Sequence, residues 1–178
     1  MTIWYRQADR RFPFLHVAAE QPSGRWHGDG EGPVQYLADT PDGAWAELLR
    51  HWNIRLAEDI GGIDRALWTV EVDEGAEVVM RPRLHRLTVL GSLSSYAACR
   101  AAARRLRMRG ASGLLAPSAA LLPGAAGGQR TTQDGLVEAG GRDGRVLVLF
   151  GSRPRLRGWC CALRGAPSER LLPLVRHL

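Results

Sequence analysis

The sequence predicts a single α+β domain in which a twisted, mostly antiparallel β core is flanked by helices. Three observations support this fold class. Residues 66–72 alternate between apolar and polar side chains, as expected of a half-buried strand. Residues 145–150 include an unbroken apolar run, which is typical of a central strand. The segments 41–52 and 95–109 each carry the start and stop signals of a helix.

Two short strands are expected before the first helix. Residues 3–6 combine large apolar side chains with Arg6, which ends the strand beside aromatic neighbours. Residues 28–32 are too rich in glycine for a helix or a regular strand, so we expect a loop there. Residues 34–38 are mostly apolar and include a β-branched and an aromatic side chain, which indicates a second strand.

The first helix, at 41–52, has a strong N-terminal signal. Thr40 is a suitable cap, Pro41 fits the first helical position, and Asp42 complements the positive end of the helix dipole. Glu47 lies in the second turn, among mostly apolar neighbours. A carboxylate at the border of a buried face needs a partner or a function.

The second helix, at 95–109, is capped by Ser94 or Ser95 and ended by Gly110. Its basic remainder is compatible with nucleic-acid binding, but we favour a solvated face, because no aromatic side chains are interleaved for base stacking. The predicted buried stripe consists of Tyr96, Cys99, Ala103 and Leu106. The basic residues are Arg100, Arg104, Arg105, Arg107 and Arg109.

The remaining elements are shorter and less clearly marked. Residues 123–144 are glycine-rich and are expected to form an exposed or poorly ordered loop, inserted into a domain that spans 1–178. The other predictions are strands at 76–80, 111–118, 158–163 and 174–177, and a short helix or turn at 168–172.

Composition excludes several classes of protein. With 178 residues and 45% hydrophobic residues, the chain can bury one substantial core. No apolar run is long enough to cross a membrane, and the first residues lack the pattern of a secretion signal, so we expect a cytoplasmic protein. The net charge is +6, and all 24 basic residues are arginine. Chemistry that depends on a lysine is therefore excluded.

The cysteines and histidines predict no metal site. The three cysteines are odd in number and lack the spacing of zinc ligands, so we expect reduced and mostly buried thiols. The five histidines likewise show no metal-binding spacing.

Five residues remain as candidates for chemistry. Their types suit an anionic ligand that contains a ribose and a ring: arginine for phosphates, tyrosine for stacking, and glutamate for sugar hydroxyls or a developing oxocarbenium ion. Each of them also has a structural alternative. The candidates are Arg6, Arg25, Tyr36, Glu47 and Ser118.

The order of short motifs along the chain resembles the RES-domain family, which is named for an arginine, a glutamate and a serine. The resemblance covers nearly the whole chain, including residues 170–177. It is carried by Tyr5-Arg6, Gly24-Arg25-Trp26, Tyr36 with Ala38-Asp39-Thr40-Pro41, Ala44-x-x-Glu47, Gly113-Leu-Leu-Ala-Pro-Ser118-Ala119 and Val146-Leu-Val-Leu-Phe150. The sequence departs from the family pattern in the long segment 123–144 and in Arg145, where an asparagine is common.

The resemblance implies a fold similar to ADP-ribosyltransferases and an activity that degrades NAD, with NAD as substrate and no true cofactor. Arg6 and Arg25 would hold the dinucleotide, and Tyr36 would line its nicotinamide end. Glu47 would act on the nicotinamide ribose, and Ser118 would complete the site. The catalytic set would be Glu47, Ser118 and Arg6, and the binding set would be Arg6, Arg25, Tyr36, Tyr5 and Trp26.

Many members of the family are toxins held inactive by a cognate antitoxin that carries a DNA-binding domain. The resemblance therefore implies such a partner for this chain. Two alternatives stay open: an inactive RES-like module that only binds a partner, and a basic nucleic-acid-binding domain. The sequence leaves open whether water, phosphate or a protein accepts the ADP-ribosyl group, and whether the chain forms a homo-oligomer.

Overall fold

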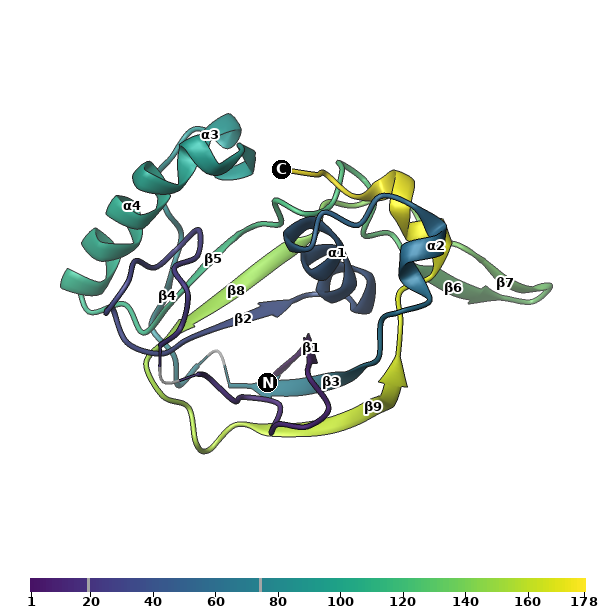
Figure 1. Cartoon of the computed structure of the whole chain (residues 1–178), viewed down its shortest axis with the longest axis horizontal. Helices are drawn as coiled ribbons and strands as arrows, with labels where there is room; N and C mark the ends of the chain where they lie inside the picture. The colour runs from purple at the N-terminus through teal and green to yellow at the C-terminus, as the bar shows by residue number, and fades with distance from the viewer. Residues whose placement is uncertain (19, 74) are drawn as a thin grey trace.

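The computed structural model of the chain describes residues 1–18, 20–73 and 75–178. The predicted α+β fold is confirmed: a seven-stranded sheet is flanked by helices, and its strands follow the order β4-β5-β8-β2-β1-β3-β9 (Figure 1). All neighbouring strands are antiparallel except β4 and β5. The strands are β1 (Thr2–Ala8), β2 (Val34–Ala38), β3 (Arg65–Val72), β4 (Val79–Met80), β5 (Gly113–Pro117), β8 (Arg145–Phe150) and β9 (Arg157–Gly165).

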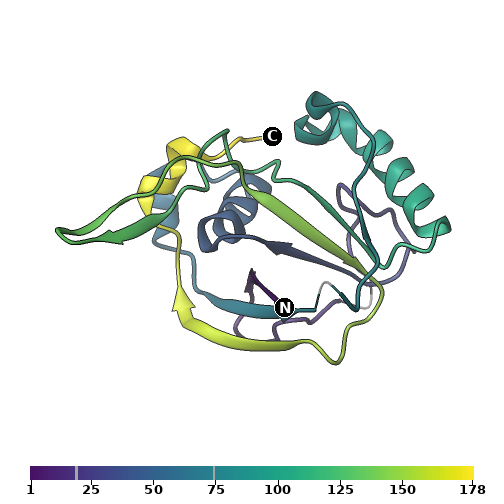
Figure 2. The same ribbon diagram turned by 180° about the vertical axis from the view of Figure 1, so that it is seen from behind.

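The helices pack against two different parts of the sheet. Helix α1 contacts β1 and β2, whereas α3 and α4 contact β5. Figures 1 and 2 show α3 and α4 together on one side of the molecule and α1 close to its middle. The helical segments are α1 (Pro41–His51), α2 (Ala57–Ile60), α3 (Arg86–Leu90), the 3-10 helix η1 (Leu93–Ser95), α4 (Tyr96–Met108) and the 3-10 helix η2 (Glu169–Leu174).

Strand β8 shows how the alternation of side chains builds the core. Val146, Val148 and Phe150 belong to the apolar cluster that includes buried residues of α3 and α4. Leu147 and Leu149 face the opposite way, where they join a second cluster. The curved sheet closes over this second cluster, whose other fully buried members are Trp4, Leu37, Val70 and Val72.

The sheet opens between β1 and β2. These strands pair only at Tyr5 and Ala38, whereas β1 and β3 pair along seven consecutive positions. Beyond Tyr5 the two strands separate, and the side chain of Arg6 spans the gap to donate a hydrogen bond to Gln35. The missing backbone pairing leaves space for a cavity in the middle of the fold.

Helix α1 begins where the sequence predicts. The hydroxyl of Thr40 accepts a hydrogen bond from the amide of Gly43 at 2.9 Å, and Pro41 is the first helical residue. The predicted helix at 95–109 is α4, and all four residues of its predicted stripe are buried.

Arg50, in the last turn of α1, is only 1% exposed and has no carboxylate partner among the described residues. Its Nη1 donates to the carbonyls of Ala119, at 2.8 Å, and Arg176. Its Nη2 donates to the carbonyl of Gly91 at 3.1 Å. Arg50 therefore connects α1 to the turn before α4, to the end of β5 and to the C-terminal tail.

The segment 123–144 is not simply a loop, as the sequence analysis expected. It contains the antiparallel hairpin of β6 (Gln129–Thr132) and β7 (Gly135–Glu138), which projects from the body of the molecule (Figure 1). The hairpin is almost fully exposed, so apolar periodicity gave no signal for it.

The strand predicted at 174–177 is wrong. Helix η2 continues to Leu174, and the tail beyond it forms only an isolated bridge between Val175 and Leu121. Pro173 has no backbone N–H to donate to a ladder, which limits strand pairing here. The predicted strand at 76–80 is also reduced, to Val79 and Met80.

The expectation of mostly buried thiols is wrong for two of the three cysteines. Cys99 is buried in α4, whereas Cys160 and Cys161 are exposed. Both exposed residues lie on β9, which is the edge strand of the sheet among the described residues.

Replacing Arg50 with methionine should destabilise the fold. The backbone carbonyls that Arg50 serves would lose their donor, so we expect the free energy of unfolding to fall by roughly 2–4 kcal/mol. Urea denaturation followed by circular dichroism measures this loss. Arg55→Met, at an exposed arginine, is the control and should change stability by less than about 0.5 kcal/mol. Equal stability of the two variants would contradict the role given to Arg50.

Candidate functional site

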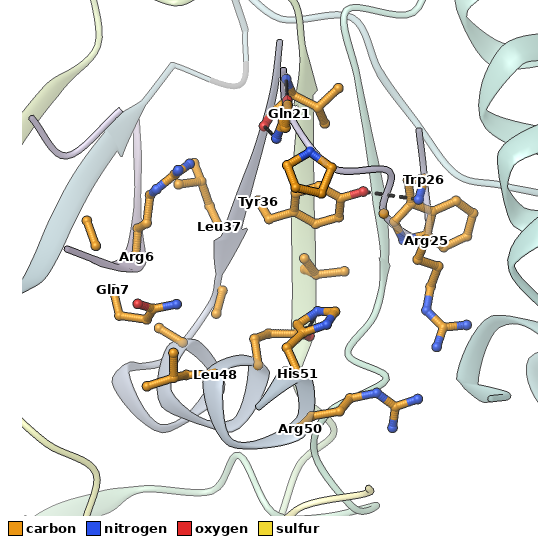
Figure 3. Close-up of a pocket in the computed structure, with 18 of the residues that line it drawn as sticks. Arg6, Gln7, Gln21, Arg25, Trp26, Tyr36, Leu37, Leu48, Arg50 and His51 are labelled. Carbon is orange, nitrogen blue, oxygen red and sulfur yellow. Dashed lines mark hydrogen bonds and ion pairs between the residues drawn. The ribbon is translucent and has the colours of Figure 1, made fainter. Parts of the chain in front are cut away.

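A cavity of about 500 Å³ lies where β1 and β2 separate. Its walls come from β1, β2, α1 and the segment 21–27 (Figure 3). Six of the seven predicted site residues line it: Tyr5, Arg6, Arg25, Trp26, Tyr36 and Glu47. Ser118 lies behind the wall, and its neighbours Pro117 and Ala119 face the cavity.

Glu47 lies at the cavity wall between Ser118 and His51. The hydroxyl of Ser118 accepts hydrogen bonds from the amides of Ala120 and Leu121 and donates to Oε1 of Glu47 at 3.5 Å. On the other side, Nε2 of His51 lies 3.6 Å from Oε2 of Glu47. Because Ser118 immediately follows β5, the strand places the hydroxyl beside the carboxylate of Glu47.

Arg6 lies on the β1 side of the cavity. Its guanidinium donates to the side chain of Gln35 and approaches the carbonyl of His16 at 3.5 Å. Burial, and secondly the charge of Arg65, lower the pKa of Arg6 to about 10. Arg6 therefore remains charged at neutral pH and contributes positive potential to the cavity.

Arg25 and Arg50 form a second basic group. Both donate to the carbonyl of Gly91, at 2.7 and 3.1 Å. Arg25 also donates to Ser95 at 3.0 Å and lies over the ring of Tyr96. Burial, followed by the charge of Arg25, lowers the pKa of Arg50. In Figure 3, Arg6 lies on one side of Tyr36, and Arg25 and Arg50 lie on the other.

The sequence analysis did not identify Arg50, His27 or Gln35 as parts of the site. Arg50 and His27 line the cavity, and Gln35 supports Arg6. Periodicity gave no signal for them, because each is a polar residue buried within an otherwise apolar or irregular segment. His27 does follow the Gly24-Arg25-Trp26 motif directly, and this position was the available clue.

Comparison with known families identifies the domain. The family model of the RES domain matches residues 3–128, which is more than half of the chain. The chain belongs to the RES-domain family. The match covers β1, β2 and α1 and ends within the segment that precedes the hairpin, so it includes all seven predicted site residues.

Among solved structures, this RES domain is similar to a chain in the crystal structure of the M. tuberculosis MbcT–MbcA toxin–antitoxin complex. The similarity has a TM-score of 0.59 at 18% sequence identity, and covers 91% of this chain and 85% of that one. At this identity the comparison supports a shared fold. Among curated proteins, no match was found.

The basic face of α4 in this RES domain holds the loop that carries Arg25 and Trp26. Arg100 donates to the carbonyl of Gly24 at 2.8 Å. Arg104 pairs with Glu31 at 2.9 Å, and Arg107 donates to the carbonyl of Glu31 at 2.8 Å. Three of the five arginines predicted to be solvated are therefore bound to the loop that forms part of the cavity wall.

No metal site emerges from the geometry. In the described part of the chain, no three His, Cys, Asp or Glu side chains come together as metal ligands would. Within the same residues, no helix has the length and apolar character needed to cross a membrane.

Glu31→Gln should loosen this loop without unfolding the domain. The carboxylate of Glu31 accepts from Arg104 and from the amide of Gly28, so its neutralisation weakens both contacts. We expect faster amide hydrogen exchange across residues 24–32 and a loss of less than about 1 kcal/mol in global stability. Hydrogen-exchange mass spectrometry at low and high salt measures this. Glu58→Gln, at an exposed carboxylate of α2, is the control. Unchanged amide exchange in residues 24–32 would contradict the role given to Glu31 in holding this loop on α4.

Proposed function

We propose that this RES domain degrades NAD by breaking the bond between nicotinamide and ribose. The observation that carries the proposal is the composition of the cavity wall, which combines Glu47 and Tyr36 with Arg6, Arg25 and Arg50. The cavity volume of about 500 Å³ is within the range of small-molecule sites, roughly 300–1,000 Å³. Membership in the RES-domain family supports this reading.

Glu47 is assigned the central chemical role. As nicotinamide leaves, positive charge develops on the ribose, and a nearby carboxylate stabilises that charge more in the transition state than in the ground state. Asp9 also lines the cavity, but it is paired with Arg11. Glu47 has no arginine partner among the described residues, so its charge is available to a ligand. Ser118 would act as a positioning residue that keeps this carboxylate in place.

The arginines would bind the phosphates of the dinucleotide. Arg6 has a partner in Gln35, and Arg25 is tied to the turn before α4, so neither is free to move far. Each guanidinium has five N–H donors, and these contacts leave others for a phosphate. Contacts to the phosphates are the same in substrate and transition state, so they would contribute to binding rather than to turnover.

We further propose that the chain is the toxin of a toxin–antitoxin pair. The structural neighbour comes from a complex described as toxin and antitoxin, and free NAD cleavage would harm the producing cell. The net charge of +6 favours a partner with an acidic contact surface. In this proposal, a cognate antitoxin that carries a DNA-binding domain covers the cavity.

The two alternatives are less well supported. An inactive binding module would have no need of a carboxylate held by Ser118 at the wall of a cavity. A nucleic-acid-binding domain would need free arginines on α4, but three of these side chains are bound to the loop 23–31.

Glu47→Gln should retain NAD binding and lower turnover by about a hundredfold, the scale of losing one electrostatic stabiliser. Purified protein is incubated with NAD, with and without phosphate, and the products are identified by mass. ADP-ribose indicates water as the acceptor, and ADP-ribose 1″-phosphate indicates phosphate. Glu58→Gln, at an exposed carboxylate on α2, is the matched control and should behave as the wild type.

An inactive wild-type protein would contradict the NAD-degrading function itself. Near-normal turnover in Glu47→Gln would instead leave the activity in place and assign Glu47 a structural role in α1.

Expression of the chain without an antitoxin should deplete cellular NAD and stop growth. Expression of Glu47→Gln at the same level is the control and should be tolerated. Growth and NAD content are measured after induction in a bacterial host. Normal growth with an undiminished NAD pool would count against the toxin proposal but not against the fold.

A further inference from the structure

We propose that His27 is a positioning residue that fixes the hydroxyl of Tyr36 at the cavity wall. This inference rests on the proposed function, because Tyr36 is the ring expected to contact the nicotinamide end of NAD. The side chain of His27 is buried, with 2% of its surface exposed. His27 lies in the loop before β2, whereas Tyr36 lies on β2 itself. Both line the same cavity.

The contacts of His27 define which ring nitrogen carries the proton. Nε2 lies 3.0 Å from the carbonyl oxygen of Pro22, which can only accept a hydrogen bond. Nε2 is therefore the protonated nitrogen of the neutral ring. Nδ1, which lies 2.9 Å from the hydroxyl of Tyr36, is then an acceptor.

The hydroxyl of Tyr36 therefore has two hydrogen-bond partners. It accepts a hydrogen bond from the amide of Trp26 at 3.0 Å, as Figure 3 shows, and donates its proton to Nδ1 of His27. Burial raises the pKa of Tyr36, so the phenol stays neutral and keeps this proton. The ring of Tyr36 cannot shift without losing both hydrogen bonds.

Gly24 provides the space for this arrangement. A Cβ atom at position 24 would lie 2.7 Å from the hydroxyl of Tyr36 and 2.8 Å from Cε1 of His27. Any larger residue would push the two rings apart. The glycine that precedes Arg25 in the family motif thus has a local physical reason in this chain.

Protonation of His27 would remove the acceptor of the Tyr36 proton, because the imidazolium has a donor on both nitrogens. The hydrogen bond from Tyr36 to His27 is therefore lost in this direction. Burial lowers the pKa of His27, and Arg107 and Arg100 of α4 lower it further, whereas the hydrogen bond to Pro22 and the charge of Glu31 raise it. Because the pKa of His27 is lowered in the folded protein, the hydrogen bond from Tyr36 to His27 is fully present above the unfolded pKa of about 6.5. It is lost as pH falls through the folded pKa.

The test compares His27→Leu with His27→Asn in the NAD-cleavage assay. Leucine removes the acceptor, so we expect kcat/KM to fall by about tenfold, mainly through KM, because the ring contacts substrate and transition state alike. The side-chain oxygen of asparagine can accept from Tyr36 and should restore much of the loss. Adding Tyr36→Phe to His27→Leu should cost no more than either change alone. His85→Leu, at an exposed histidine outside the cavity, is the control.

A measurement on the unmodified protein tests the hydrogen bond between Tyr36 and His27 independently of the NAD-cleavage assay. Long-range ¹H–¹⁵N correlation spectra report the tautomer and titration of each histidine, and His27→Asn assigns the signals of His27. We expect the Nε2–H tautomer and a pKa below about 6.5. The Nδ1–H tautomer, additive losses in the double variant, or normal kinetics in His27→Leu would overturn the proposal. A wild-type protein that does not cleave NAD, yet shows the expected tautomer, would refute the proposed function but support the hydrogen bond between Tyr36 and His27.

Discussion

The buried guanidinium of Arg50 is the interaction on which the cavity depends. It binds backbone carbonyls rather than a carboxylate, and so its charge is solvated by fixed dipoles from three segments of chain. One turn earlier, the same helix carries Glu47. The turn at Gly91 is bound by Arg50 and Arg25 together, so two like charges are held close without a neutralising partner among the described residues. Such a fixed pair attracts anions into the cavity.

The second constraint is the single pairing between β1 and β2. Beyond Tyr5 the two strands separate, and this separation lets side chains of both strands, including Arg6 and Tyr36, line one cavity. The cost is the loss of several backbone hydrogen bonds, which side chains partly replace: Arg6 binds Gln35, and Gln35 binds the carbonyl of Leu15 at 3.1 Å. The polar groups that bridge the gap are thus part of the fold as well as of the site.

The sequence was informative wherever local signals decide the structure. Thr40 and Pro41 located the start of α1, and the alternation in 66–72 located β3. The arginines were harder, because apolar periodicity treats any charged residue as exposed, and the contacts of Arg50 involve residues 41 to 127 positions away. The hairpin was missed although its turn residues Gln133 and Asp134 are followed by a glycine: Gly135, the first residue of β7, has a positive φ of 116° that favours glycine.

The same limit explains why the contacts between the basic face of α4 and the loop were not predicted, although Arg104, Arg105 and Arg109 are exposed as expected. Its arginines are amphipathic, so a helix that looks solvated in sequence can bind a loop through its guanidiniums while its apolar stripe packs on the sheet. Arg107 even lies over the ring of Phe150, 4.1 Å from the centroid, at the end of β8. Binding a phosphate on this face would require Arg104 and Arg107 to release Glu31, and the loop carrying Arg25 and His27 would be released with it. The positive charge of α4 therefore shapes the cavity indirectly, by holding its wall, and the arginines available to an anionic ligand are those inside it.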